Sequence, residues 1–236
     1  MAQREGAVTV AGKELPRTAA DSYRDLMEQV KKRTEAVNFF LRMHGMYAQV
    51  MAESVALQLR NILETIVLGS LVSDLSEYEK RRTDIRKTRR MSLLMKTMDA
   101  ANKDYYPVPT RQVLDADGRV IETVSVESGF LTRNECPRLY GRCSNMLHTL
   151  GPTADPLSFL DAAPRWLNRI ITLLNHHQIQ LSNPDIQLWT LMNASSDGRV
   201  HVYTFKRVRE KDIRFLPRDA QERIKHLEHS REDSQA

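Results

Sequence analysis

The sequence of 236 residues contains only two cysteines, Cys136 and Cys143, which are too few for a disulfide framework. They fall within one predicted helix, about 10 Å apart along its axis and beyond disulfide reach. The longest nearly uncharged apolar run, Ile62 to Val72, has about half the length that a membrane span needs. No basic and then apolar leader opens the sequence. We therefore expect a cytoplasmic protein that makes no use of a membrane.

Several catalytic motifs are also absent. The sequence contains no GxGxxG, P-loop, CxxC pair, HExxH or GxSxG, which excludes the common nucleotide-binding, zinc-protease and serine-hydrolase classes. The adjacent His176 and His177 would point about 100° apart on a helix and lack an acidic or cysteine partner at ligand spacing. We interpret them as a helix end and expect neither a metal nor a cofactor. Any chemistry must then come from side chains alone.

Positive charge is concentrated in one place. The chain has 35 lysines and arginines against 30 acidic residues, a net charge of +5. Residues 80–90 contain seven positive charges and one negative, so the other 225 residues sum to −1. The seven cations of this basic segment are Lys80, Arg81, Arg82, Arg86, Lys87, Arg89 and Arg90. We interpret the basic segment as a binding surface for nucleic acid; the alternative is an ordinary solvated helix face.

Hydrophobic periodicity predicts a fold that is mainly α, a helical bundle with two small β-hairpins. Helices are expected over 19–43, 46–74, 132–147 and 156–177, with one or two more through the basic segment that end by Tyr105. The hairpins are indicated by Asp117-Gly118 and Asp197-Gly198, each between β-prone runs. The helix at 46–74 is apolar over most of its circumference, as is typical of a central core helix.

The predicted organisation has four parts. A flexible N-terminal arm at 1–18 precedes a helical body at 19–178, which contains a hairpin insertion near 112–127. A C-terminal β-hairpin at 179–215 packs on the body, because an isolated hairpin is only marginally stable in water. A polar C-terminal helix or tail occupies 216–236.

The most informative segment is LYGRCSNMLHTLGP, residues 139–152, where Arg142 and His148 precede a Gly-Pro helix stop. An arginine followed four to six residues later by histidine, near the end of a helix in a helical domain, resembles the motif of the HEPN superfamily. Active HEPN members are metal-independent ribonucleases. The resemblance spans about residues 20–178 and implies RNA as substrate, Arg142 and His148 as catalytic residues, and a homodimer in which two motifs share one cleft.

These residue types suit RNA cleavage without a metal. A histidine removes the 2′-hydroxyl proton, and a cation stabilises the negative charge that develops on phosphorus. Where the family commonly has a polar residue after the arginine, this chain has Cys143, followed by Ser144 and Asn145. Asn145, three residues before His148, is placed to orient the imidazole. The alternative for His148 is a helix C-terminal cap.

The spacing of Arg142 and His148 also predicts that their side chains converge poorly within one protomer. A separation of six residues is about 600°, so the two side chains point about 120° apart on an ideal helix. Glu53, Arg60 and Glu64, the only charges between Met46 and Leu71, lie within about 40° of one line on their helix. We interpret this stripe as part of the same cleft, with an acidic residue holding an arginine; the alternative is a narrow solvent face.

The resemblance thus implies a bacterial, HEPN-like, metal-independent endoribonuclease that acts on RNA as a homodimer. The resemblance favours a toxin or an antiphage-defence effector, restrained by a protein partner or antitoxin. The alternative is a non-catalytic helical module that dimerises and binds a partner protein or nucleic acid, since one fold hosts many functions.

Overall fold

The computed structural model describes residues 18–43, 47–72, 90–118, 120–148 and 155–207, together with Arg218. The predicted arm at 1–18, apart from Thr18, and the predicted helix or tail at 216–236, apart from Arg218, lie outside these residues. Of the basic segment, only Arg90 is described. No helix within the described ranges is both long enough and apolar enough to span a membrane.

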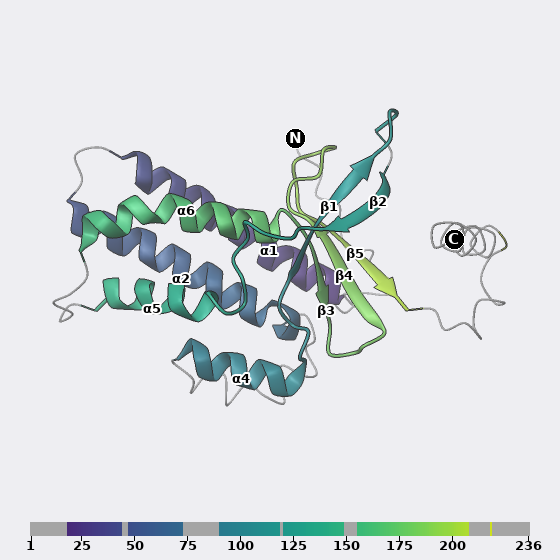
Figure 1. Ribbon diagram of the computed structural model, residues 1–236, viewed down its shortest axis with the longest axis horizontal. Helices are drawn as coiled ribbons and strands as arrows, with labels where there is room; N and C mark the ends of the chain where they lie inside the picture. Colours follow the sequence, from purple (N-terminus) through teal and green to yellow (C-terminus); the bar gives the residue numbers. More distant parts are fainter. Residues whose placement is uncertain are drawn as a thin grey trace, which may run out of the picture.

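The helices gather on one side of the molecule (Figure 1). They are α1 (Ala19–Arg42), α2 (Ala48–Val72), α4 (Met91–Ala101), α5 (Cys136–Met146) and α6 (Pro156–Leu174). Helix α2 packs against the other four, and its apolar residues from Ala52 to Leu71 form the centre of the core. The prediction of a central core helix is therefore confirmed. Thr18 and Asp21 form a capping box that fixes the start of α1.

The strands form a single antiparallel sheet beside the helices (Figure 1), in the order β2-β1-β3-β4-β5. They are β1 (Val108–Leu114), β2 (Val120–Ser125), β3 (His176–Gln180), β4 (Ile186–Leu191) and β5 (His201–Lys206). Both predicted hairpins are present, as the pairs β1–β2 and β4–β5. The predicted fold class is only partly correct, however, because β3 joins the two hairpins into one five-stranded sheet. Of the described residues, 55% are helical and 18% are in strands, so the fold is mixed α/β.

Strand β3 begins where the sequence predicts the last turn of a helix. Helix α6 ends at Leu174, and the two histidines start the strand. Nδ1 of His177 donates to the Leu174 carbonyl at 2.7 Å, and the Tyr23 hydroxyl lies 2.8 Å from Nε2. Nδ1 of His176 lies 3.0 Å from the Thr110 hydroxyl. Among the described residues no group of three or more metal-ligating side chains forms. His177 ties the sheet to α1 and α6, whereas His176 contacts β1 within the sheet.

Close contact between α1 and α2 depends on Gly69. A Cβ added there would lie 2.8 Å from Cε2 of Tyr23, whose ring is fully buried and anchored to His177. We expect Gly69→Ala to lower the free energy of unfolding by about 1 to 3 kcal/mol through overpacking. At Gly141 an added Cβ meets nothing within 4 Å, so Gly141→Ala should raise stability by about 0.5 to 1 kcal/mol. Urea denaturation of both variants measures this, and equal midpoints would contradict it.

Candidate functional site

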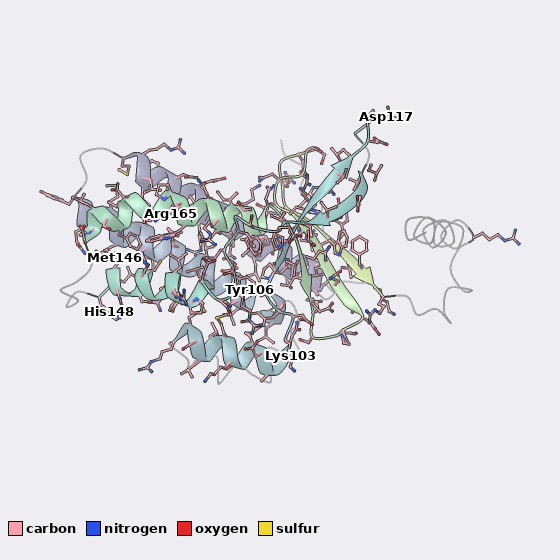
Figure 2. The ribbon with its side chains drawn as sticks, in the orientation of Figure 1. Lys103, Tyr106, Asp117, Met146, His148 and Arg165 are labelled. Carbon is pink, nitrogen blue, oxygen red and sulfur yellow. The ribbon has the colours of Figure 1, made fainter. Side chains whose placement is uncertain are left out.

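Helix α5 carries Arg142, the first residue of the predicted catalytic pair, and His148 follows its C-terminal end. Its buried side chains recur every three or four residues and form one stripe: Cys136, Leu139, Tyr140, Cys143 and Met146. Both cysteines are free thiols, and burial raises the pKa of each to about 12. They stay protonated at neutral pH and are therefore poor nucleophiles. His148 lies just past the helix, at the opposite end of the molecule from Asp117 in the β1–β2 turn (Figure 2).

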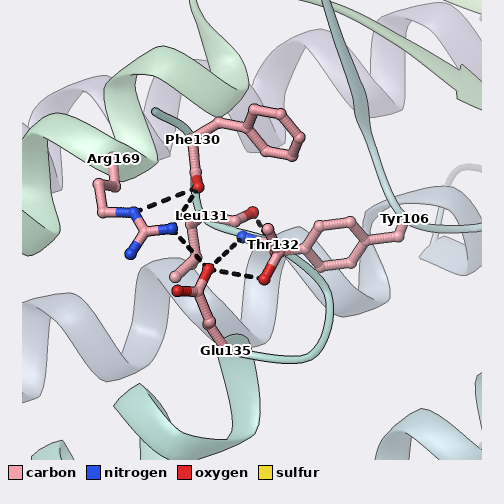
Figure 3. Close-up of polar contacts among 6 residues, drawn as sticks. All are labelled: Tyr106, Phe130, Leu131, Thr132, Glu135 and Arg169. Carbon is pink, nitrogen blue, oxygen red and sulfur yellow. Dashed lines mark hydrogen bonds and ion pairs between the residues drawn. The ribbon is translucent and has the colours of Figure 1, made fainter. Parts of the chain in front are cut away.

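A polar network fixes the start of α5 against α6 (Figure 3). Nη2 of Arg169 donates to Oε2 of Glu135 at 2.6 Å and to the Phe130 carbonyl at 2.8 Å. The same Oε2 accepts from the Thr132 hydroxyl at 2.6 Å and from the Thr132 N–H at 3.0 Å. These hydrogen bonds, led by the Thr132 hydroxyl, hold the pKa of Glu135 below its usual value. The network sets where α5 begins and so where His148 lies.

Part of the predicted stripe on α2 faces α5. Nε of Arg60 donates to Oε1 of Glu64 at 3.2 Å, as the i,i+4 spacing predicts. The Tyr140 hydroxyl donates to the same oxygen at 2.7 Å, and the Arg60 guanidinium lies 5.0 Å from the centre of the Tyr140 ring. Burial, followed by the bond to Glu64, raises the pKa of Tyr140 to about 12, so it remains a donor. Glu53 instead accepts from Gln49 at 2.6 Å on an exposed part of α2.

An open pocket of about 450 Å³ lies between α2, α5 and the first turn of α4. We call it the His148 pocket. Its lining residues are Arg60, Arg90, Met91, Ser92, Pro137, Tyr140, Gly141, Ser144 and His148. Three predicted site residues, Arg60, Ser144 and His148, therefore meet in one cavity. The fourth predicted residue there is Arg90, the last cation of the basic segment.

Arg142 lies on another side of α5. Its guanidinium sits 5.5 Å from the centre of the Trp166 ring of α6. It lines a separate pocket of about 230 Å³ with Asn145, Asp155 and Ser158 among its neighbours. Within one protomer the predicted pair is therefore divided between two pockets, which follows from the 120° separation expected on a helix. The Asn145 side chain lines the Arg142 pocket too, and the hydrogen bond between Asn145 and His148 is a backbone contact, from the His148 N–H to the Asn145 carbonyl at 3.4 Å.

Sequence reasoning missed Tyr140 and Gly141 as parts of the site. The sequence spacing could have identified Tyr140, because Tyr140, Ser144 and His148 are four residues apart and so share one face of a helix. Arg142, two residues from both Tyr140 and Ser144, does not lie on that face. The contribution of Arg60 and Arg90 depends on tertiary packing, since α2 and α4 are distant from α5 in sequence.

Comparison with known proteins adds no assignment to this geometry. No protein-family profile matches the chain, no curated protein matches its sequence, and no solved structure matches its fold.

Proposed function

We propose that the protein is a metal-independent endoribonuclease, HEPN-like in its Arg-x5-His motif, that acts on RNA as a homodimer. The observation that supports this most is the His148 pocket, where an imidazole lies in one cavity with two arginines and a serine. These are the groups that RNA cleavage without a metal requires: a proton acceptor and cations for a negatively charged phosphate.

The proposed reaction is an internal transfer at phosphorus. His148 takes the proton of a ribose 2′-hydroxyl, and the 2′ oxygen forms a bond to the adjacent phosphorus. The bond from phosphorus to the 5′ oxygen then breaks, and that oxygen takes the proton back from the imidazolium. Arginine side chains stabilise the extra charge on the phosphate oxygens in between.

The homodimer belongs to the proposal because Arg142 and His148 of one protomer line different pockets. A second copy of the chain would bring its own Arg142 to the His148 pocket, as the resemblance implies. Such an enzyme would damage cellular RNA, which fits a toxin or antiphage-defence effector held in check by a protein partner or antitoxin.

The direct test is cleavage of RNA by the purified protein in the presence of EDTA. We expect cleavage products that end in a 2′,3′-cyclic phosphate, because no water enters the first step. Absence of cleavage at every RNA tested, by protein shown to be folded, would overturn the proposal. Light scattering on the same preparation measures whether it is a dimer.

The second candidate is a non-catalytic module that binds a partner protein or nucleic acid. It is favoured by the position of Arg142, which stacks on Trp166 and lines a pocket apart from His148. An arginine packed on an aromatic ring has a structural role without any catalysis. RNA binding without cleavage would support this candidate.

A further inference from the structure

The His148 pocket has the charge of an anion-binding site. Of the nine described residues that line it, two are arginines, one is His148, and none is acidic. Its volume of about 450 Å³ lies within the range of about 300 to 1,000 Å³ for small-ligand sites. An anionic ligand is therefore the kind that this cavity is suited to hold.

Arg60 is held in position for such a ligand. The bond to Glu64 uses Nε, and the ring of Tyr140 lies beneath the guanidinium. Among the described residues Glu64 is the only carboxylate that pairs with Arg60, and that bond does not use the two terminal amino groups. A guanidinium that is already oriented loses little entropy when it binds phosphate, and its planar fork matches two phosphate oxygens.

Arg90 and α4 add positive charge from a third direction. Arg90 is the N-cap residue of α4, and within the described part of the chain no side-chain hydrogen bond caps that helix end. Met91 and Ser92 of the first turn line the pocket, so the positive end of the helix dipole contributes there.

The distance along α5 indicates what kind of anion fits. Tyr140, beneath Arg60, and His148 are separated by two helical turns, about 12 Å along the axis. A single phosphate cannot contact both ends of that span, whereas a short stretch of RNA backbone can. Ser144 lies midway on the same helical face and offers a hydroxyl to the backbone between them.

We propose that Arg60 and Arg90 bind backbone phosphates of single-stranded RNA in the His148 pocket and thereby present the strand to His148. Arg60 is then a positioning residue supplied by α2, outside the Arg-x5-His motif. This inference rests on the proposed function, because it assigns the RNA-binding part of the same site.

The test measures binding of a short fluorescent single-stranded RNA to His148→Ala protein, which prevents cleavage. We expect an additional Arg60→Gln to weaken binding about tenfold, the size typical of one charge-assisted hydrogen bond. It should also reduce the slope of log affinity against log salt by about 0.7 for each phosphate that is no longer neutralised. Arg111→Gln removes the same charge from an exposed position on β1 and should change neither quantity. Equal effects of the two substitutions would overturn the inference.

Two further variants keep the test decisive if Arg60→Gln disturbs the fold. Arg90 is exposed, so Arg90→Gln should fold normally and lower the affinity and the salt slope. Gly141→Leu fills the pocket without changing charge, since nothing lies within 4 Å of the added Cβ, and should weaken binding. If both variants bind the RNA as tightly as the His148→Ala parent protein, the inference is overturned. If RNA binding depends on Arg60 but the wild-type protein never cleaves RNA, the ribonuclease is refuted while the assignment of Arg60 to RNA binding is supported.

Discussion

Replacing His148 with alanine is expected to slow RNA cleavage by about 10²- to 10⁴-fold, the usual contribution of a general base. The residue lies just past α5, on the wall of a pocket that contains Arg60, Arg90 and Ser144. His148 is exposed, so the substitution should leave the fold intact. Single-turnover cleavage in EDTA, with light scattering to confirm an unchanged oligomeric state, measures the effect.

His201→Ala is the matched control for that experiment. His201 lies on β5, where its Nε2 meets the Asp197 carboxylate at 3.1 Å, and it lines no part of the His148 pocket. We expect cleavage at the wild-type rate in this variant. If His148→Ala protein cleaves as fast as the wild type, His148 is not the proton acceptor.

The helices could be predicted from sequence because each buries one face with a regular period. The starts of α1 and α6 follow from their capping residues, and the course of α2 follows from apolar spacing; both are local properties. Strand β3 could not be predicted in this way. Its sequence, HHQIQ, is separated from α6 by Asn175 alone, and its strand conformation depends on pairing with β1 and β4.

The candidate site was partly predictable for the same reason. A helical face is a local property, so Ser144 and His148 could be placed together. The division of Arg142 from His148 follows from the angle between them, but which element packs on each side of α5 does not. Tertiary contacts place Arg60 over Tyr140 and Arg142 over Trp166. Each arginine therefore stacks on an aromatic ring, but Arg60 lines the His148 pocket and Arg142 lines a different one.

The buried pair Tyr23 and His177 is expected to make the protein less stable in acid. His177 is fully buried, with Nδ1 donating to the Leu174 carbonyl and Nε2 accepting from the Tyr23 hydroxyl. Burial lowers the pKa of His177 from 6.5 to about 4. Between these values the unfolded chain binds a proton that the native state does not, so the free energy of unfolding falls as the pH falls.

The two pKa values of His177, unfolded and native, set the size of the stability loss and the pH range in which to measure it. The contribution of His177 to the free energy of unfolding is fully present above pH 6.5 and declines toward pH 4. A shift of this size corresponds to a loss of about 3 kcal/mol. Burial also lowers the pKa of His176, which adds a loss of the same sign. Urea denaturation at intervals between pH 7 and pH 4 measures the decline. His177→Asn should start from a lower stability, because the bond to Tyr23 is lost, and should then depend less on pH. An equally steep decline in that variant would show that other groups cause the acid sensitivity, since asparagine cannot take up the proton.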